Sequence, residues 1–229
     1  MTGRAAMQDQ DRFKTTRAGA PAIAMLAASL VIAPVAAQEI RFGGSAHDLD
    51  FVGGGQASEQ GPNLVADVVL PQVDWEWLKW IGRPTVYVGG SVNLSDDTSF
   101  IGFGLAWRKY FFKDKFYGES NFGYVVHNGT IEVPALSPTN TDAQNIALIE
   151  RNLEEIEFGS RDLFRSAIVM GYQIRPRWAV EAFFEHLSHG QIIGNGSNEG
   201  LNNLGARLAY RFGPSAAEVR ARRKAKQGQ

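Results

Sequence analysis

The chain alternates large apolar residues with small or charged ones in a series of segments separated by turns. Such period-two alternation predicts β-strands whose successive side chains point to opposite faces. Each segment has about 10–13 residues, the length that a tilted strand needs to cross the hydrocarbon of a bilayer. An even number of strands is typical of bacterial outer-membrane barrels. The eight predicted strands span 40–51, 63–72, 85–94, 99–112, 115–126, 162–174, 177–189 and 201–212.

The two faces of these strands differ in a way that favours a membrane barrel. In 201–212, large apolar residues such as Leu204 and Leu208 share one face, and Arg207 and Arg211 share the other. Glycines and paired charges fit the lumen of a narrow barrel, and the apolar face fits lipid. We therefore predict an all-β, eight-stranded antiparallel transmembrane β-barrel of the outer-membrane type. A soluble lipocalin-like barrel is an alternative that the alternation alone leaves open. The charged residues predicted to face the lumen are Arg108, Glu119, Glu181, Glu185, Arg207 and Arg211, with Glu181 and Glu185 pairing with Arg207 or Arg211.

The predicted connections have different lengths at the two ends of the barrel. Tight turns at 113–114 and 175–176 fall at one end, which we assign to the periplasm, and the long loops 127–161 and 190–200 fall at the other. Within the first long loop, apolar residues at near-helical spacing predict a short amphipathic helix over 142–156. The periplasmic connection 73–83 contains three tryptophans, which suit an aromatic girdle at the membrane interface.

Composition and the ends of the chain narrow the class of protein. The chain has no cysteine, which excludes disulfides and thiolate metal sites, and its net charge of −1 does not indicate a nucleic-acid partner. Basic residues, an apolar run and the small residues of 35–37 predict a signal peptide over 1–37, cleaved after Ala37, with a membrane anchor helix as the alternative. The barrel then spans 38–212 in the outer membrane, and the polar, basic tail 213–229 is predicted to be disordered.

The candidate chemistry lies at the outer end of the strand predicted over 177–189. His186 and Ser188 are two residues apart and project from one face, which continues the apolar positions Trp178 and Phe184. A polar pair on a lipid-facing surface has no obvious structural purpose. An imidazole within reach of a hydroxyl is the arrangement of a nucleophile and its general base.

Further groups are needed to complete such a site. A third residue should orient the histidine, and the candidates are Asn202, which begins the neighbouring strand, and Glu199 in the preceding loop. The side chain of His189, or a backbone N–H near Gly190, is positioned by sequence to donate to an oxyanion.

The same residues carry a resemblance to a known family. The motifs are His186-x-Ser188, Asn198-Glu199-Gly200-Leu201-Asn202 and Leu204-Gly205-x-Arg207-x-x-Tyr210-Arg211-Phe212, with Gly159-Ser160-Arg161 and Leu163-Phe164-Arg165 further upstream. Over residues 159–212 the chain resembles the lipid A 3-O-deacylases, the PagL-type group often called acyloxyacyl hydrolases. The resemblance implies an outer-membrane esterase that removes an ester-linked acyl chain from lipid A with a Ser–His–acid triad on the lipid face. It makes Ser188 the nucleophile and His186 the general base.

Two positions depart from the family pattern. Asn202 stands where the family has its acid, and His189 stands where asparagine is common after the serine. Three interpretations stay open: Asn202 suffices, as an amide does in papain-like enzymes; Glu199 substitutes; or the chain is a catalytically weak or inactive barrel with a structural role. The implied partners are lipid A or lipopolysaccharide and outer-membrane lipid, with no cofactor or metal required, and a homodimer stays open.

Overall fold

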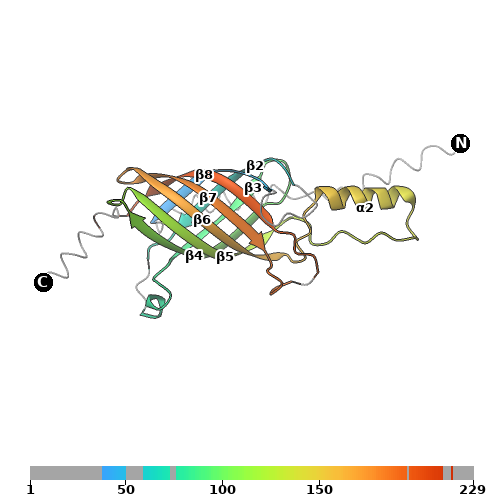
Figure 1. Ribbon diagram of the computed structural model, residues 1–229, viewed down its shortest axis with the longest axis horizontal. Helices are drawn as coiled ribbons and strands as arrows, with labels where there is room; N and C mark the ends of the chain where they lie inside the picture. The colour runs from blue at the N-terminus through green and yellow to red at the C-terminus, as the bar shows by residue number, and fades with distance from the viewer. Residues whose placement is uncertain (1–37, 50–58, 73–75, 195, 214–217, 219–229) are drawn as a thin grey trace.

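The computed structural model describes residues 38–49, 59–72, 76–194, 196–213 and 218. Each strand pairs antiparallel with the next, and β8 pairs with β1, which closes the barrel (Figure 1). The predicted eight-stranded antiparallel barrel is therefore confirmed. The strands are β1 (Glu39–Ala46), β2 (Pro62–Val69), β3 (Thr85–Asn93), β4 (Phe100–Phe111), β5 (Phe116–His127), β6 (Asp162–Arg175), β7 (Trp178–Ser188) and β8 (Leu201–Arg211).

Most strand ends agree with the predicted ranges to within two residues, and the differences arise at prolines. The β1–β2 ladder stops at the pair Ala46 and Pro62, so β1 is shorter than the predicted 40–51, part of which lies outside the described residues. Strand β2 ends at Val69, before Pro71, instead of at residue 72. Proline has no N–H for the ladder and is found at strand ends and edges.

The long loop between β5 and β6 contains the predicted helix, α2 (Asp142–Glu154). A capping box starts it, because Thr141 accepts from the N–H of Gln144 and the Gln144 side chain accepts from the N–H of Thr141. The helix protrudes from one end of the barrel (Figure 1). In the described part of the chain, no helix is long and apolar enough to cross a bilayer.

The barrel is polar inside and apolar outside. The charged residues predicted to face the lumen are buried or half-buried, whereas large apolar side chains are exposed on the outer wall. So much exposed apolar surface in a closed barrel fits lipid and not water. The lipocalin-like alternative is therefore wrong. The outward apolar residues include Phe42, Phe103, Phe122, Ile168, Met170, Leu204 and Leu208.

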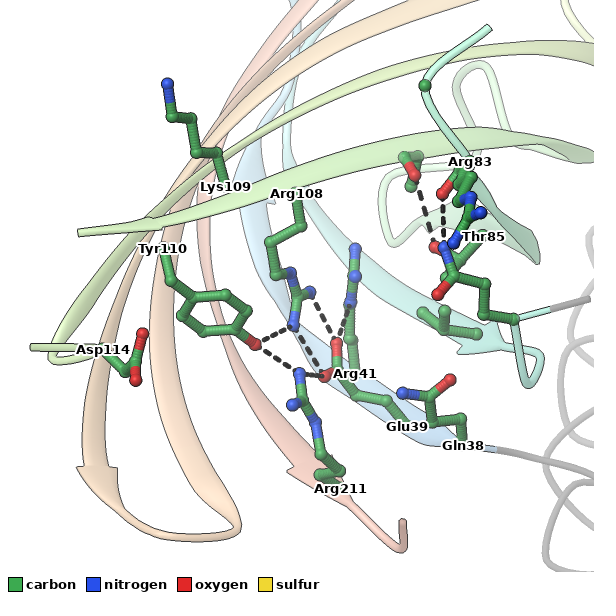
Figure 2. A pocket seen from close by; sticks show the side chains of 14 residues that line it. Gln38, Glu39, Arg41, Arg83, Thr85, Arg108, Lys109, Tyr110, Asp114 and Arg211 are labelled. Atoms are coloured by element: carbon green, nitrogen blue, oxygen red, sulfur yellow. Dashed lines mark hydrogen bonds and ion pairs between the residues drawn. The ribbon is translucent and has the colours of Figure 1, made fainter. Parts of the chain in front are cut away.

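Buried ion pairs line the lumen at the end of the barrel where β1 begins. Three guanidinium groups surround the Glu39 carboxylate, from Arg41 at 2.8 Å, Arg108 at 2.8 Å and Arg211 at 3.1 Å (Figure 2). The Tyr110 hydroxyl accepts from Arg211 at 2.5 Å and lies beside the same group. Each buried charge therefore has an opposite partner, which offsets the loss of hydration.

A second cluster continues these ion pairs toward the middle of the barrel. Arg207 donates to Glu181 at 2.5 Å, as predicted, and it also contacts Asp67. Glu185 does not pair with Arg207 or Arg211; its partner is Arg165 at 2.7 Å. The prediction for Glu185 was wrong because Arg165 lies on the neighbouring strand β6, where it pairs with Leu187, two residues from Glu185 on the same face of β7. The lumen is therefore occupied by protein side chains in this region.

The two barrel ends have the predicted asymmetry. Short turns at 112–115 and 176–177 close the end at which β1 begins and β8 finishes, and the long loops extend from the other end. The predicted signal peptide 1–37 and nearly all of the tail 213–229 lie outside the described residues, so both stay predictions.

Candidate active site

Strand β7 places His186 and Ser188 on the outer wall. Along β7 the residues Glu181, Phe183, Glu185 and Leu187 are buried toward the lumen, and the residues between them are exposed or half-buried. His186 and Ser188 belong to the second set, so they project from the outer side of the barrel, near the end of the strand from which the long loops extend. The alternation of the sequence thus predicted their common face.

The imidazole of His186 is held by the neighbouring strand. Asn202 is its direct partner in the β7–β8 ladder, and the Asn202 Oδ1 lies 2.8 Å from the His186 Nδ1. Asn202 is only 1% exposed, so water does not compete for this contact. An amide oxygen only accepts, so Nδ1 carries the proton and Nε2 is left with its lone pair. That tautomer is the one that a general base requires.

Two neighbours of the imidazole were not singled out from the sequence. A Cβ added at Gly200 would lie 2.4 Å from the His186 Cε1, so only glycine fits against this ring. Ser166 on β6 pairs directly with His186 from the other side and is exposed. Alternation put Ser166 on the lipid face, but its register with His186 could not be read from the sequence alone.

The Ser188 hydroxyl is close in sequence to the imidazole but is not bonded to it. The Ser188 hydroxyl makes no hydrogen bond to His186 or to another residue in the described part of the chain, whereas its backbone pairs with Phe164 in the β6–β7 ladder. Same-face residues two apart on a strand have Cβ atoms about 7 Å apart, a distance that a rotated serine and an imidazole can bridge. Catalytic hydrogen bonds are often formed only in the substrate complex.

The structure places Glu199 away from the orienting position. Its carboxylate accepts from the N–H of Glu157 at 2.8 Å, and its own N–H donates to the Glu157 carbonyl at 3.1 Å. These two bonds join the long loop after α2 to the segment that precedes β8. Asn202 therefore holds the imidazole, whereas Glu199 holds the two loops together.

His189 is also engaged in holding a loop. Its side chain is buried, with Nδ1 accepting from the N–H of Gln191 at 3.0 Å and Nε2 lying 2.9 Å from the Ser197 carbonyl. Both ring nitrogens thus have partners, and the imidazole has no proton left to give to an oxyanion. Gly190 has a φ of +60° and its backbone N–H has no partner among the described residues. The backbone near Gly190 is the remaining candidate donor.

A second buried histidine pairs with a carboxylate at the end of the barrel from which the long loops extend. The Glu59 carboxylate lies 2.9 Å from the His47 Nε2 and accepts from the Thr98 hydroxyl and N–H at 2.9 and 2.8 Å. Burial raises the pKa of Glu59, but these hydrogen bonds outweigh burial and bring the pKa below its ordinary 4.5. Among the described residues, no group of three or more acidic or histidine side chains could hold a metal ion.

A family model for lipid A 3-O-deacylase (PagL) matches residues 69–211, which include β3 to β8 and the pair of His186 and Asn202. The chain belongs to the lipid A 3-O-deacylase (PagL) family. The resemblance predicted from the motifs of residues 159–212 is thereby confirmed and extends over most of the barrel. The search of curated proteins gave no match.

Solved structures agree on the fold. The crystal structure of the outer membrane enzyme PagL aligns with a TM-score of 0.50 and 15% identity, covering 76% of this chain and 99% of that one. Neisserial surface protein A aligns with a TM-score of 0.45, 9% identity and coverages of 76% and 96%. Ail of Yersinia pestis aligns with a TM-score of 0.37, 12% identity and coverages of 77% and 99%. At such identities, the PagL likeness shows the barrel fold alone.

Proposed function

We propose that the chain is an outer-membrane esterase that removes an ester-linked acyl chain from lipid A through Ser188 and His186 on the lipid-facing wall. Family membership supports the reaction class. The contact between Asn202 and His186 is the observation that carries the residue assignment, because it fixes the tautomer of a base. The localisation that we propose includes export with the predicted signal peptide.

The proposed reaction needs no group outside the chain except water. The Ser188 oxygen attacks the ester carbonyl while the His186 Nε2 takes the hydroxyl proton. The tetrahedral oxyanion accepts a hydrogen bond from the backbone near Gly190. As the intermediate collapses, the imidazolium returns the proton to the sugar oxygen that leaves, and an acyl-serine remains. Water, deprotonated by the same imidazole, then releases the fatty acid.

The wall beside the imidazole offers an apolar surface to the acyl chain. Trp178 and Phe184 share the outer face of β7 with His186. Next to Asn202, a shallow, mainly apolar depression lies over β8, β1 and β2, and its outward positions include Ala46 and Ala206. Small residues at these positions let the acyl chain of the lipid lie close to the barrel wall. The ester would then be presented at the height of the imidazole.

The direct test is mass spectrometry of lipid A treated with the purified, folded barrel. The wild type should remove one acyl chain, and Ser188→Ala should abolish the loss. Ser166→Ala is the matched control, because this second outward serine also neighbours His186 and should leave the activity intact. Equal deacylation by the wild type and Ser188→Ala would refute the nucleophile assignment.

A catalytically inactive barrel with a structural role is the second candidate function. The observation that favours it is the amide at position 202 together with a Ser188 hydroxyl that does not contact the imidazole. This candidate predicts that folded wild type, Ser188→Ala and Ser166→Ala all leave lipid A unchanged, so the same experiment separates the two functions.

A further inference from the structure

The connection between β2 and β3 carries exposed aromatic side chains outside the barrel. It contains the 3-10 helix η3 (Glu76–Lys79), in which Trp77 is 60% exposed, followed by Trp80, which is 92% exposed, and Ile81, which is exposed as well. Figure 1 shows this segment as the small turquoise coil that projects sideways from the barrel near the end opposite α2. Exposed apolar surface of this kind marks a site of contact with a membrane or with another protein.

The base of this projection is fixed to the lipid-facing wall. Trp107 points outward from β4, and its indole N–H donates to the Ile81 carbonyl at 2.5 Å. Gly82 packs against the same indole, where an added Cβ would lie 3.3 Å from the Trp107 Cδ1. The N–H of Arg83 donates to the Leu78 carbonyl at 2.8 Å and closes the loop. The exposed part of the segment therefore lies beside the barrel, and only its base at Gly82 and Arg83 borders the cavity at the mouth of the lumen.

Positive charge surrounds the same end of the barrel. Exposed cations occur at the turn between β4 and β5, at the turn between β6 and β7, and on the outer face of β4. Phospholipid headgroups offer phosphates at this depth, so the charge is complementary to them. The exposed cations are Lys109, Lys113, Lys115, Arg175 and Arg177.

We propose that residues 76–82 form a foot that inserts into the phospholipid headgroup layer of the periplasmic leaflet. Trp77, Trp80 and Ile81 occupy the boundary between headgroups and acyl chains, where an indole keeps an apolar body in lipid and its N–H in a polar layer. The foot stands against β4, which lies across the closed barrel from the β7–β8 wall that bears His186. It thereby fixes the depth of the barrel independently of any catalytic activity.

The chain has no cysteine, so a spin label can report the depth of the foot without background. We would label Trp80→Cys in phosphatidylethanolamine–phosphatidylglycerol vesicles and measure collision with oxygen and with a water-soluble nickel chelate. Ile168→Cys on the lipid-facing wall and Asn152→Cys on α2 are the reference positions. Label 80 should meet the chelate severalfold less often than label 152 and oxygen more often, with a depth between the two references. A label at 80 that behaves like label 152 would overturn the proposal.

A second measurement keeps the native side chains. Phospholipids brominated near the headgroup quench indoles at the membrane interface, and the loss of emission is compared between wild type and Trp77→Phe/Trp80→Phe. Phenylalanine keeps the apolar contact and removes the indole emission. The quenched part of the emission should fall in the double variant if the foot is inserted. An unchanged quenched fraction would contradict insertion, and heat-modifiable gel mobility checks that both barrels are folded.

Discussion

The amide at position 202 makes a strong prediction, because replacing it with a carboxylate changes one contact in a site of known geometry. In Asn202→Asp, a charged oxygen replaces the amide oxygen that lies 2.8 Å from the His186 Nδ1. The residue is 1% exposed, so solvent screens this new charge little. The perturbation therefore acts on the imidazolium that the proposed transition state contains.

The magnitude follows from the difference between a neutral and a charged hydrogen bond. A neutral bond contributes about 1 kcal/mol and a bond to a charged group contributes about 1.5–3 kcal/mol. The imidazolium thus gains about 0.5–2 kcal/mol from the carboxylate. Since about 1.4 kcal/mol corresponds to a tenfold change, the rate should rise about twofold to thirtyfold. The carboxylate also favours the protonated imidazole before reaction, so the acid limb of the rate profile should move to higher pH.

The assay is kcat/KM for lipid A in mixed micelles as a function of pH, with Asn202→Ala and Glu199→Gln alongside. Asn202→Ala should slow the reaction without moving the acid limb toward higher pH. Glu199→Gln should leave the limb in place, because the carboxylate of Glu199 contacts the Glu157 backbone. If Asn202→Asp and Asn202→Ala both keep the wild-type rate and profile, the orienting role of Asn202 is refuted.

Three further predictions test the surroundings of the site. Gly200→Ala should lower the initial rate of deacylation at least about tenfold, because the added methyl group would displace the His186 ring. The heat-modifiable gel mobility of the barrel should be unchanged. The pKa of Glu59 is lower in the folded state than its ordinary 4.5, so the ionised carboxylate stabilises the folded state at pH values above 4.5. This stabilisation is lost as the pH falls through the lower pKa of the folded state. Proteolysis of the extracellular end should therefore accelerate in acid, less so in Glu59→Gln. Arg207→Met removes the closest cationic partner of Glu181, which keeps the Tyr117 hydroxyl at 2.5 Å and Arg108 at 3.4 Å. It should cost about 1.5–3 kcal/mol in urea unfolding from vesicles, the contribution of a hydrogen bond to a charged group, whereas no measurable loss would contradict that pairing.

The sequence predicted the strands well because the two faces of each one have opposite requirements. The lipid-facing side requires large apolar side chains, and the lumen requires glycine or paired charges. An assignment shifted by one residue would therefore put charges against lipid and large apolar side chains in the lumen. The strand ends were less predictable. Alternation continues past Ala46, but the ladder stops there because its partner position is Pro62, a property of the register and not of β1 itself.

For the candidate site, the alternation of the sequence predicted which side chains share a face of the barrel. Parity placed His186, Ser188 and Asn202 on one face, but only register shows that Asn202 and Ser166 flank the imidazole. His189 looked like a donor because it follows the serine. Its two loop contacts depend on the conformation of residues 191–197, which no pattern of residue types specifies.

The position of the ion pairs decides where chemistry can take place. Arginines and carboxylates neutralise each other in the described lumen, so they offer no spare base to a substrate. Of the four histidines, His47 is paired with Glu59, His127 ends on the inner face of β5 and His189 is fixed in its loop. Among these histidines, His186 alone has an imidazole that faces outward from a described strand, two residues before Ser188 and on the same face. In the proposed function the long loops face the cell exterior, and an ester at the boundary between sugar and acyl chains lies at the height of this imidazole, so the substrate reaches the base without leaving the membrane.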